Sequence, residues 1–198
     1  MAETLLALIV FLFPFAYSPG PGNIFFAANG ARFGFRATVP ASAGYHLATW
    51  VVTAGLGLGL LTALHNAPGA FAALRIGGAL YVLWLAGKLI RAGTTETAMD
   101  AKPASFLDGA ALLLLNPKAY VIIALMFTQF PPEGGGDGLA LVLAISTAFT
   151  LNNLAAFTLW TAAGDRLAAC FARESSARAL NTGMGIVLAA VAVWMLLT

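Results

Sequence analysis

The stretch Ser18-Pro19-Gly20-Pro21-Gly22-Asn23 interrupts the first long apolar run of the chain, which covers residues 5–31. A proline removes one backbone amide and clashes with the preceding helical turn, so a helix ends here. Pro21 favours the start of a new helix, because proline suits the first helical position. The stretch therefore predicts a segment made of two half-helices.

The composition is that of an integral membrane protein. The 198 residues are 60% hydrophobic and only 9% charged, with a mean hydropathy of +0.87, which leaves too little polar surface to cover a soluble globule. The net charge of +2 gives no indication of nucleic acid binding. One cysteine, Cys170, excludes an internal disulfide, a CxxC redox pair and a cysteine-rich metal site.

Six segments are long and apolar enough to cross a bilayer as helices. A span needs about 20 mostly apolar residues, because lipid offers backbone amides no partner. The segments are residues 5–31, 38–64, 71–90, 106–130, 139–163 and 180–197. The connections between them are short, so we expect one membrane domain over residues 1–198.

The second half of the chain repeats the first. Three spans per half mean that the second half enters the membrane from the opposite side, as in an inverted repeat. Asn116-Pro117-Lys118 interrupts span four as the first stretch interrupts span one, and at about 1.5 Å per residue both breaks fall near mid-bilayer. The predicted fold is an all-α integral membrane protein. It has six transmembrane helices in two inverted three-helix repeats, residues 1–92 and 104–198, with spans one and four broken.

Basic residues predict the orientation in the membrane, since short cytoplasmic loops carry an excess of Lys and Arg. Most basic residues follow spans one, three or five; these are Arg32, Arg36, Lys88, Arg91, Lys102, Arg166, Arg173 and Arg178. Arg75 lies on the other side. This bias places both termini outside the cytoplasm.

The two breaks predict a site for a small anionic group. Each new half-helix presents its backbone amides and positive dipole end to the middle of the membrane. Unpaired backbone at that depth is tolerated only where it lines a wet cavity or is covered by protein. Two such ends together suit a carboxylate. The alternative is a pair of simple proline kinks relieved by neighbouring helices.

Lys118 lies well inside span four, next to Pro117. A lysine at the centre of a membrane helix costs about 2.5 to 3.5 kcal/mol, so a partner or water should meet it. Its charge would add to the anion site. The alternative is that the side chain extends to the membrane surface.

Three further polar residues lie in the spans. His46 follows Tyr45 in span two, and histidine changes charge near neutral pH, so His46 is a candidate proton carrier or, equally, a neutral hydrogen-bonded core residue. Asn153 follows Asn152 in span five; we assign Asn153 and Tyr45 to substrate contacts. Interhelical asparagine bonds that only stabilise packing are the alternative.

Acidic residues are missing from the centres of the predicted spans, since every Asp and Glu falls in a connection or at a span boundary. We therefore expect no metal, sodium or carboxylate relay site in the membrane. No Ser, His and Asp arrangement suits hydrolysis. The sequence predicts that the protein is not an enzyme and needs no cofactor.

Two long motifs resemble the LysE/RhtB family of bacterial amino acid exporters. They are "SPGPGNIFFAANGARFGFRA" and "FLDGAALLLLNPKAYVIIALMFTQF". Thr128 and Ala48 depart from the family pattern. The stretches "GGALYVLWLAGKLI" and "AKPASF" are similar to those of cysteine and O-acetylserine exporters. The resemblance implies site roles for Pro19, Gly20, Pro21, Asn23, Asn116, Pro117 and Lys118.

The expected function is export of small amino acids or their derivatives across the bacterial inner membrane, by alternating access of the two halves around the central site. The resemblance implies exchange of substrate for protons. His46 is the candidate carrier, because His46 and Lys118 are the groups that could titrate within the membrane path and Lys118 is assigned to the anion site. The alternative is that the amine of the substrate or the membrane potential supplies the coupling. The expected partners are the amino acid and the lipid bilayer, with a possible homodimer and no nucleic acid. The alternative is a passive channel, which could not concentrate substrate, or a membrane scaffold that transports nothing.

Overall fold

The structure is a computed structural model that describes residues 2–60, 68–91, 102–132, 138–170 and 174–197. Within these ranges the chain forms eight α-helices and one π-helical turn, without a β-strand, which confirms the all-α prediction. The elements are α1 (Ala2–Tyr17), α2 (Pro21–Phe33), α3 (Phe35–Gly55), the π-helix η1 (Leu56–Leu60), α5 (Pro68–Arg91), α6 (Phe106–Leu114), α7 (Pro117–Gln129), α8 (Gly138–Cys170) and α9 (Glu174–Leu197).

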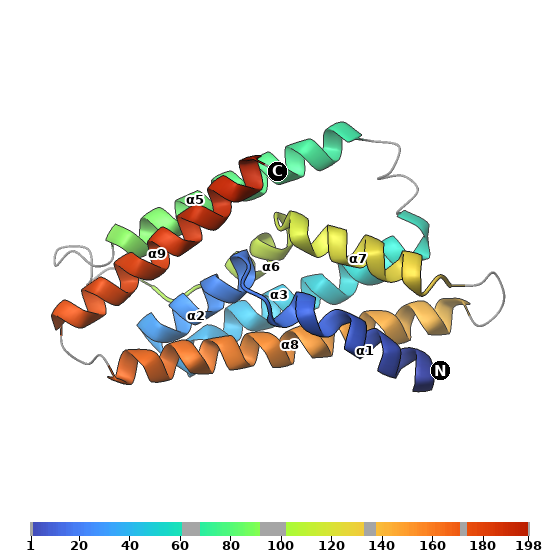
Figure 1. The fold of residues 1–198 in the computed structure, drawn as a ribbon, viewed down its shortest axis with the longest axis horizontal. Coiled ribbons are helices and arrows are strands. Elements are labelled where there is room, and N and C mark those ends of the chain that lie inside the picture. Colours follow the sequence, from blue (N-terminus) through green and yellow to red (C-terminus); the bar gives the residue numbers. More distant parts are fainter. Residues whose placement is uncertain (1, 61–67, 92–101, 133–137, 171–173, 198) are drawn as a thin grey trace.

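The helices run roughly along the long axis of the molecule (Figure 1). α5 and α9 pack side by side along one flank, and α8 runs along the opposite flank. α1, α2, α3, α6 and α7 lie between them. The close pairs α2 with α8 and α3 with α6 join the two halves of the chain, so neither half forms a separate body.

Large apolar side chains cover much of the outer surface, as lipid requires and water does not tolerate. Val10, Leu107 and Leu159 are 67%, 75% and 60% exposed. Within the described ranges one helix, Gly138–Ala168, is apolar and long enough to cross a bilayer alone. Two bent helix pairs meet the same criterion when each pair is taken together. The count of six spans stays a prediction.

The helical breaks occur at the two proline motifs. α1 ends at Tyr17 and α2 begins at Pro21, with a bend of 62° between them. α6 and α7 are bent by 61°, and α7 begins at Pro117. Each second half-helix has 13 residues with proline in its first turn. The two breaks therefore bend the chain by nearly the same angle and lead into helices of equal length.

Glycines let the helices of the two halves touch through their backbones. A Cβ atom on Gly30 would collide with the carbonyl of Thr161, and one on Gly164 with the carbonyl of Ala27, where α2 meets α8. Gly44 and Gly109 are equally close to the backbones of Phe106 and Ala41, where α3 meets α6. A larger residue at any of these four glycines would push the helices apart.

The structure corrects two predicted boundaries. The predicted span at 139–163 is too short, because α8 continues to Cys170. Gly164 signalled a connection in the sequence, but here it lies inside the helix and packs on α2. The predicted span at 180–197 also starts too late, since α9 begins at Glu174. Residues 61–64 of the predicted second span lie outside the described residues.

The turn between α2 and α3 is a single residue, Gly34. Its φ of 85° lies in the left-handed region that glycine adopts without strain. Its amide donates to the carbonyl of Gly30 at 2.9 Å, which closes the end of α2. The predicted connection between spans one and two is therefore shorter than the sequence indicated.

Candidate functional site

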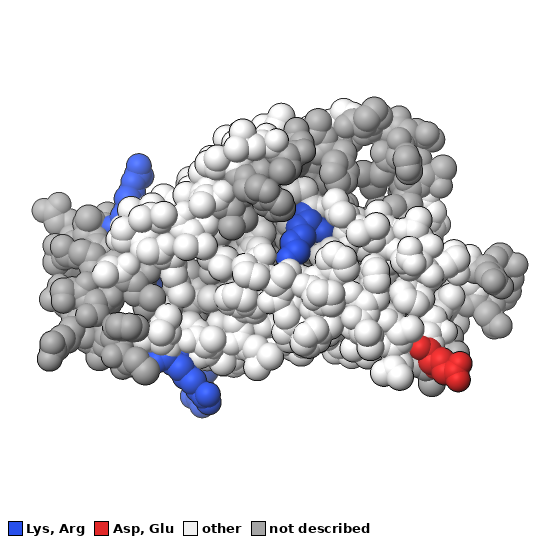
Figure 2. Space-filling model, in the orientation of Figure 1, with Lys and Arg blue, Asp and Glu red and all other residues white. Residues whose placement is uncertain are grey.

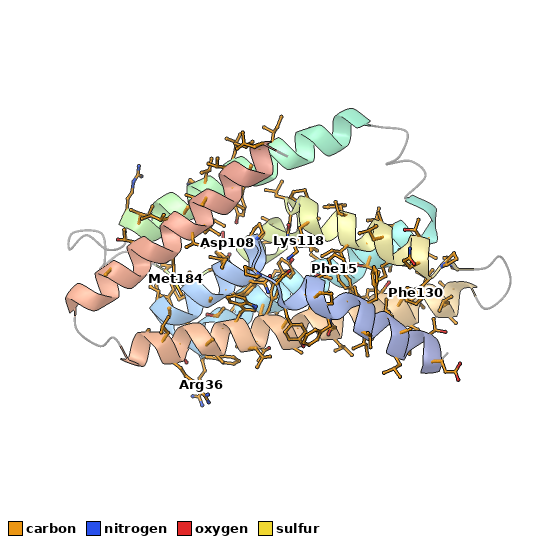
Figure 3. All side chains as sticks on the ribbon, in the orientation of Figure 1. Phe15, Arg36, Asp108, Lys118, Phe130 and Met184 are labelled. Carbon is orange, nitrogen blue, oxygen red and sulfur yellow. The ribbon has the colours of Figure 1, made fainter. Side chains whose placement is uncertain are left out.

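A cavity lies between the two helical breaks. Its volume is about 310 Å³, counting the part that opens to solvent. The described residues that line it are Phe15, Ala16, Gly20, Pro21, Gly22, Asn23, Tyr45, Asn116, Lys118, Ala119, Ile122, Phe149, Asn153 and Phe157. Figure 3 labels Lys118 beside the breaks, and Figure 2 shows basic atoms at the same place, near the centre of this face. The lysine is thus reachable from outside the bundle.

The amino-terminal end of α2 faces this cavity without a side-chain cap. Gly20 is the N-cap residue and has no side chain to accept a hydrogen bond. Its carbonyl accepts from the amide of Ile24 at 3.0 Å. The first amides of a helix have no acceptor within it, and those of Gly22 and Asn23 have none elsewhere in the described residues. This end of α2 therefore offers free donors.

The amino-terminal end of α7 is capped by its own side chain. Asn116 Oδ1 accepts from the amide of Lys118 at 3.2 Å, and the Asn116 carbonyl accepts from the amide of Ala119 at 3.0 Å. Asn116 Nδ2 donates to the Tyr45 hydroxyl at 3.3 Å. The α7 end is therefore occupied, and its cap connects to α3.

Lys118 reaches from α7 to the other break. Its Nζ donates to Ser18 Oγ at 3.0 Å and to the Ser18 carbonyl at 3.4 Å. Ser18 Oγ in turn donates to the Phe15 carbonyl at 3.1 Å. The carbonyl end of α1 stabilises a cation, which accounts for a lysine at this depth without an acidic partner. An ammonium has three donor hydrogens, so one is left for a ligand.

The two other asparagines at the cavity are Asn23 and Asn153. Asn23 Nδ2 donates to the Ala16 carbonyl at 2.9 Å, which ties α2 to the last turn of α1. Asn153 is buried on α8 and lines the cavity. Asn153 is therefore placed where it can contact a ligand.

The structure brings most of the predicted site residues together. Those that line the cavity are Gly20, Pro21, Asn23, Tyr45, Asn116, Lys118 and Asn153. Pro19 is exposed and does not line it, and Pro117 is buried against Gly78 of α5. These two prolines shape the breaks from outside the cavity.

His46 is buried next to the cavity but does not line it. Its Nδ1 is 2.7 Å from the carbonyl of Ser42 and donates to it, since a carbonyl only accepts. Its Nε2 has no partner among the described residues. The ring of Phe157, 5.4 Å away between centroids, packs on His46 and also lines the cavity.

The sequence analysis assigned no site role to Ser18, Gly22, Phe149 and Phe157. Phe149, Asn153 and Phe157 are four residues apart, so they share one face of α8. That spacing from Asn153 could have identified both phenylalanines. A Cβ on Gly22 would lie 2.7 Å from Phe157 Cζ and 3.5 Å from the Tyr45 hydroxyl. Gly22 therefore keeps space between α2 and these rings.

A resident metal has no visible site in the described ranges, where no three His, Cys, Asp or Glu side chains come together. The groups around the cavity are a lysine, three asparagines with different roles, a tyrosine hydroxyl and free backbone amides. This set can bind a small ligand that carries a carboxylate and polar groups.

Comparisons with known proteins agree with the sequence motifs. The family model described as LysE type translocator matches residues 13–198. The cysteine/O-acetylserine efflux proteins of Escherichia coli (strain K12) and Shigella sonnei are each 30% identical to this chain over 183 residues, with 90% of both chains covered. The protein of that name in Escherichia coli O1:K1 is 29% identical over the same length. No solved structure matches the chain.

Proposed function

The chain belongs to the LysE type translocator family, and we propose that it exports a small neutral amino acid or a derivative of one. A member of this family is a transporter of the bacterial inner membrane and not an enzyme. The similar proteins are named for efflux of cysteine and O-acetylserine, so these two compounds are the first substrates to test.

The observation that carries this proposal is the uncapped end of α2 facing the ammonium of Lys118. A Cβ on Gly20 would lie only 3.0 Å from Lys118 Nζ, so the open helix end and the charge are adjacent. A carboxylate there would accept from the free amides of Gly22 and Asn23 and from Lys118. Charge-assisted hydrogen bonds of this kind are about twice as strong as neutral ones.

The rest of the substrate would meet neutral groups. Asn153 and the Tyr45 hydroxyl offer acceptors to an amino group, and the ring of Phe157 supports its other face. The described lining contains no Asp or Glu. A substrate with a second positive charge would meet Lys118 without a compensating carboxylate, so lysine and arginine should be rejected.

We place this site in a carrier of two inverted repeats, residues 1–92 and 104–198, that alternate access between the two sides of the membrane. The nearly equal bends of 62° and 61° and the equal lengths of α2 and α7 support a repeat. A carrier saturates and supports counterflow, whereas a passive channel does neither. A homodimer stays a prediction, which the mass of the purified protein in detergent tests.

The proposed substrate can be tested by competition in reconstituted vesicles. Vesicles loaded with labelled L-cysteine in reducing buffer should release it with saturable kinetics. O-acetyl-L-serine should compete, while L-cysteinamide, which lacks the carboxylate, and L-lysine should not. Release that never saturates, or equal competition by L-cysteinamide, would contradict a carboxylate-binding carrier.

The orientation proposal places both termini outside the cytoplasm, on the strength of the basic residues after spans one, three and five. A reporter that is active only outside the cytoplasm, fused after Thr198, should be active. The same reporter inserted in the connection at residues 93–102 should be silent. The reverse pattern would show that the orientation is wrong.

Proton coupling through His46 is the last part of the proposal. His46→Gln keeps hydrogen bonding but cannot titrate near neutral pH. We expect this variant to exchange labelled for unlabelled L-cysteine at equal pH, yet to lose the stimulation caused by an imposed pH gradient. Undiminished stimulation would assign the proton to another group.

A further inference from the structure

The interface between α3 and α8 is unusually polar for two buried membrane helices. His46, Thr49 and Thr53 lie on one face of α3, at spacings of three and four residues. Ser146, Thr150 and Asn153 lie on one face of α8 at similar spacings. Thr49, Thr53 and Ser146 are fully buried, and His46 and Asn153 are 6% and 7% exposed. We call these six residues the polar seam.

Contacts across the interface place the two sets opposite each other. Trp50 Nε1 donates to Thr147 Oγ1 at 3.1 Å, and the rings of His46 and Phe157 are in contact. The helices are antiparallel, so one turn along α3 corresponds to one turn back along α8. His46 is thereby near the level of Asn153, Thr49 near that of Thr150, and Thr53 near that of Ser146.

Six helical hydroxyls among the described residues bond to the backbone of their own helix. The side chains that donate to the carbonyl four residues earlier are Thr38, Thr49, Thr128, Ser146, Thr147 and Thr161. Thr53 and Thr150 do not, although both lie inside helices, and their buried Oγ1 atoms have no partner in the described residues. Their hydroxyls are therefore left without a hydrogen bond among the described residues.

Every buried polar side-chain atom without a partner in the described residues belongs to α3 or α8. The atoms are His46 Nε2, Thr53 Oγ1, Thr150 Oγ1 and Asn152 Nδ2. A buried polar atom without a partner costs about 1 to 3 kcal/mol, so such atoms mark sites of ordered water. Three of the four are in the polar seam, and Asn152 is adjacent to it.

We propose that the polar seam holds a file of ordered water molecules that carries protons between His46 and the level of Thr53 and Ser146, toward the end of the bundle where α8 begins. The proton role rests on the export function proposed above. Hydroxyl groups and water both donate and accept, so each can take a proton from one neighbour and pass one to the next. At His46 the proton adds to the lone pair of Nε2, giving an imidazolium, and leaves from the same nitrogen.

The seam is closed beyond Thr53 and Ser146. There Leu56 and Val142 belong to a buried apolar cluster with Phe127, and the π-helical turn η1 continues α3. A Cβ on Gly57 would collide with the Phe127 ring. In this conformation the water file ends against apolar side chains, which prevents a continuous proton leak.

Few charged groups surround His46. It packs on Phe26 of α2 and Phe157 of α8, and Tyr45 is its titratable neighbour on α3. The charged residues of these three helices lie near their ends; they are Arg32, Arg36, Asp165 and Arg166. Lys118 lines the adjacent cavity, so a proton on His46 would repel it and favour substrate release.

The test uses two variants, Thr53→Val and Thr150→Val, which keep side-chain shape and remove the unpaired hydroxyls. Thr161→Val is the matched control, since its buried hydroxyl on α8 bonds the Phe157 carbonyl and lies outside the seam. The full-length variants are purified, reconstituted and loaded with labelled L-cysteine. Efflux driven by a pH gradient and exchange at equal pH are measured, together with the thermal midpoint of unfolding.

We expect efflux driven by the pH gradient to fall about tenfold in both seam variants, since each breaks the hydrogen-bond chain that carries the proton. Exchange at equal pH should be unchanged, and the control should behave as wild type. The midpoints of the seam variants should be equal to or below that of wild type, because valine removes a partner of bound water.

A dry seam would give the opposite result. Removing an unpaired buried hydroxyl would then raise the midpoint in both variants, and pH-driven efflux would not change; either finding overturns the water file. Failure of the wild type to move L-cysteine would count against the proposed function alone. In that case the midpoints still decide whether the seam holds water.

Discussion

The two helical breaks bend the chain by nearly the same amount but differ at the N-cap residue. Both bend by about 60° and both lead into a 13-residue helix that begins with proline. At the N-cap position, however, α2 has Gly20 and α7 has Asn116. The glycine leaves the end of α2 open, whereas the asparagine closes the end of α7. Similar breaks therefore have different chemistry.

The difference makes the breaks complementary. The open end supplies free backbone amides, and the closed end supplies Lys118, whose ammonium crosses to Ser18 at the other break. Asn116 also holds the Tyr45 hydroxyl at the cavity. One break thus offers a place for a carboxylate, and the other positions the side chains around it. Three changes would break or sharpen this contrast.

The largest effect should come from giving α2 a cap of its own. In Gly20→Asp, the new carboxylate would accept from the free amides of α2 and pair with Lys118, where the substrate carboxylate is proposed to bind. We expect no detectable saturable efflux of L-cysteine from vesicles, with the protein folded and its thermal midpoint raised.

Gly20→Ala is the control for that change, since it adds the same Cβ without the carboxylate. That Cβ meets the flexible end of Lys118, and the backbone of Gly20 is extended, so alanine should fit. Efflux by Gly20→Asp at the rate of Gly20→Ala would mean that the end of α2 does not bind the carboxylate.

Removing the charge from the other break should have the second largest effect. Lys118→Ala loses a charge-assisted bond worth roughly 1.5 to 3 kcal/mol, which corresponds to about 10- to 150-fold weaker apparent affinity for L-cysteine. Lys118→Arg should recover only part of this, because a planar guanidinium does not replace a compact ammonium. Concentration dependence of efflux measures both; wild-type affinity in a folded Lys118→Ala would remove the residue from the site.

The smallest effect should come from removing the side-chain cap at the amino-terminal end of α7. Asn116→Ala removes the cap and should cost about 1 kcal/mol, or a fall of about 2 to 4 °C in the thermal midpoint for a chain of this size. Asn116→Ser keeps a capping oxygen but cannot reach Tyr45, so it should restore the midpoint. A midpoint equally low in both variants would mean that the asparagine acts through Tyr45 rather than as a cap.

The class of the protein and the position of both breaks could be predicted from local sequence. Prolines and glycines act on the backbone within one turn, and an apolar composition excludes a soluble fold. The depth of Lys118 in an apolar segment marked it as unusual without any knowledge of its neighbours. The predicted end of span five before Gly164 was wrong because local sequence does not show how a glycine is used. A glycine can end a helix or lie inside it and contact a neighbouring helix, and the position of that neighbour decides between the two.

Sequence alone determined that this chain is an all-helical membrane protein of the LysE type, with two proline breaks and a lysine beside one of them, because these properties depend on composition and on neighbours along the chain. Only the tertiary structure decided that Lys118 meets Ser18, that Phe157 separates His46 from the cavity, and that α3 and α8 share a polar seam. These contacts join residues far apart in sequence, and the packing of helices through glycine and aromatic side chains determines which residues meet.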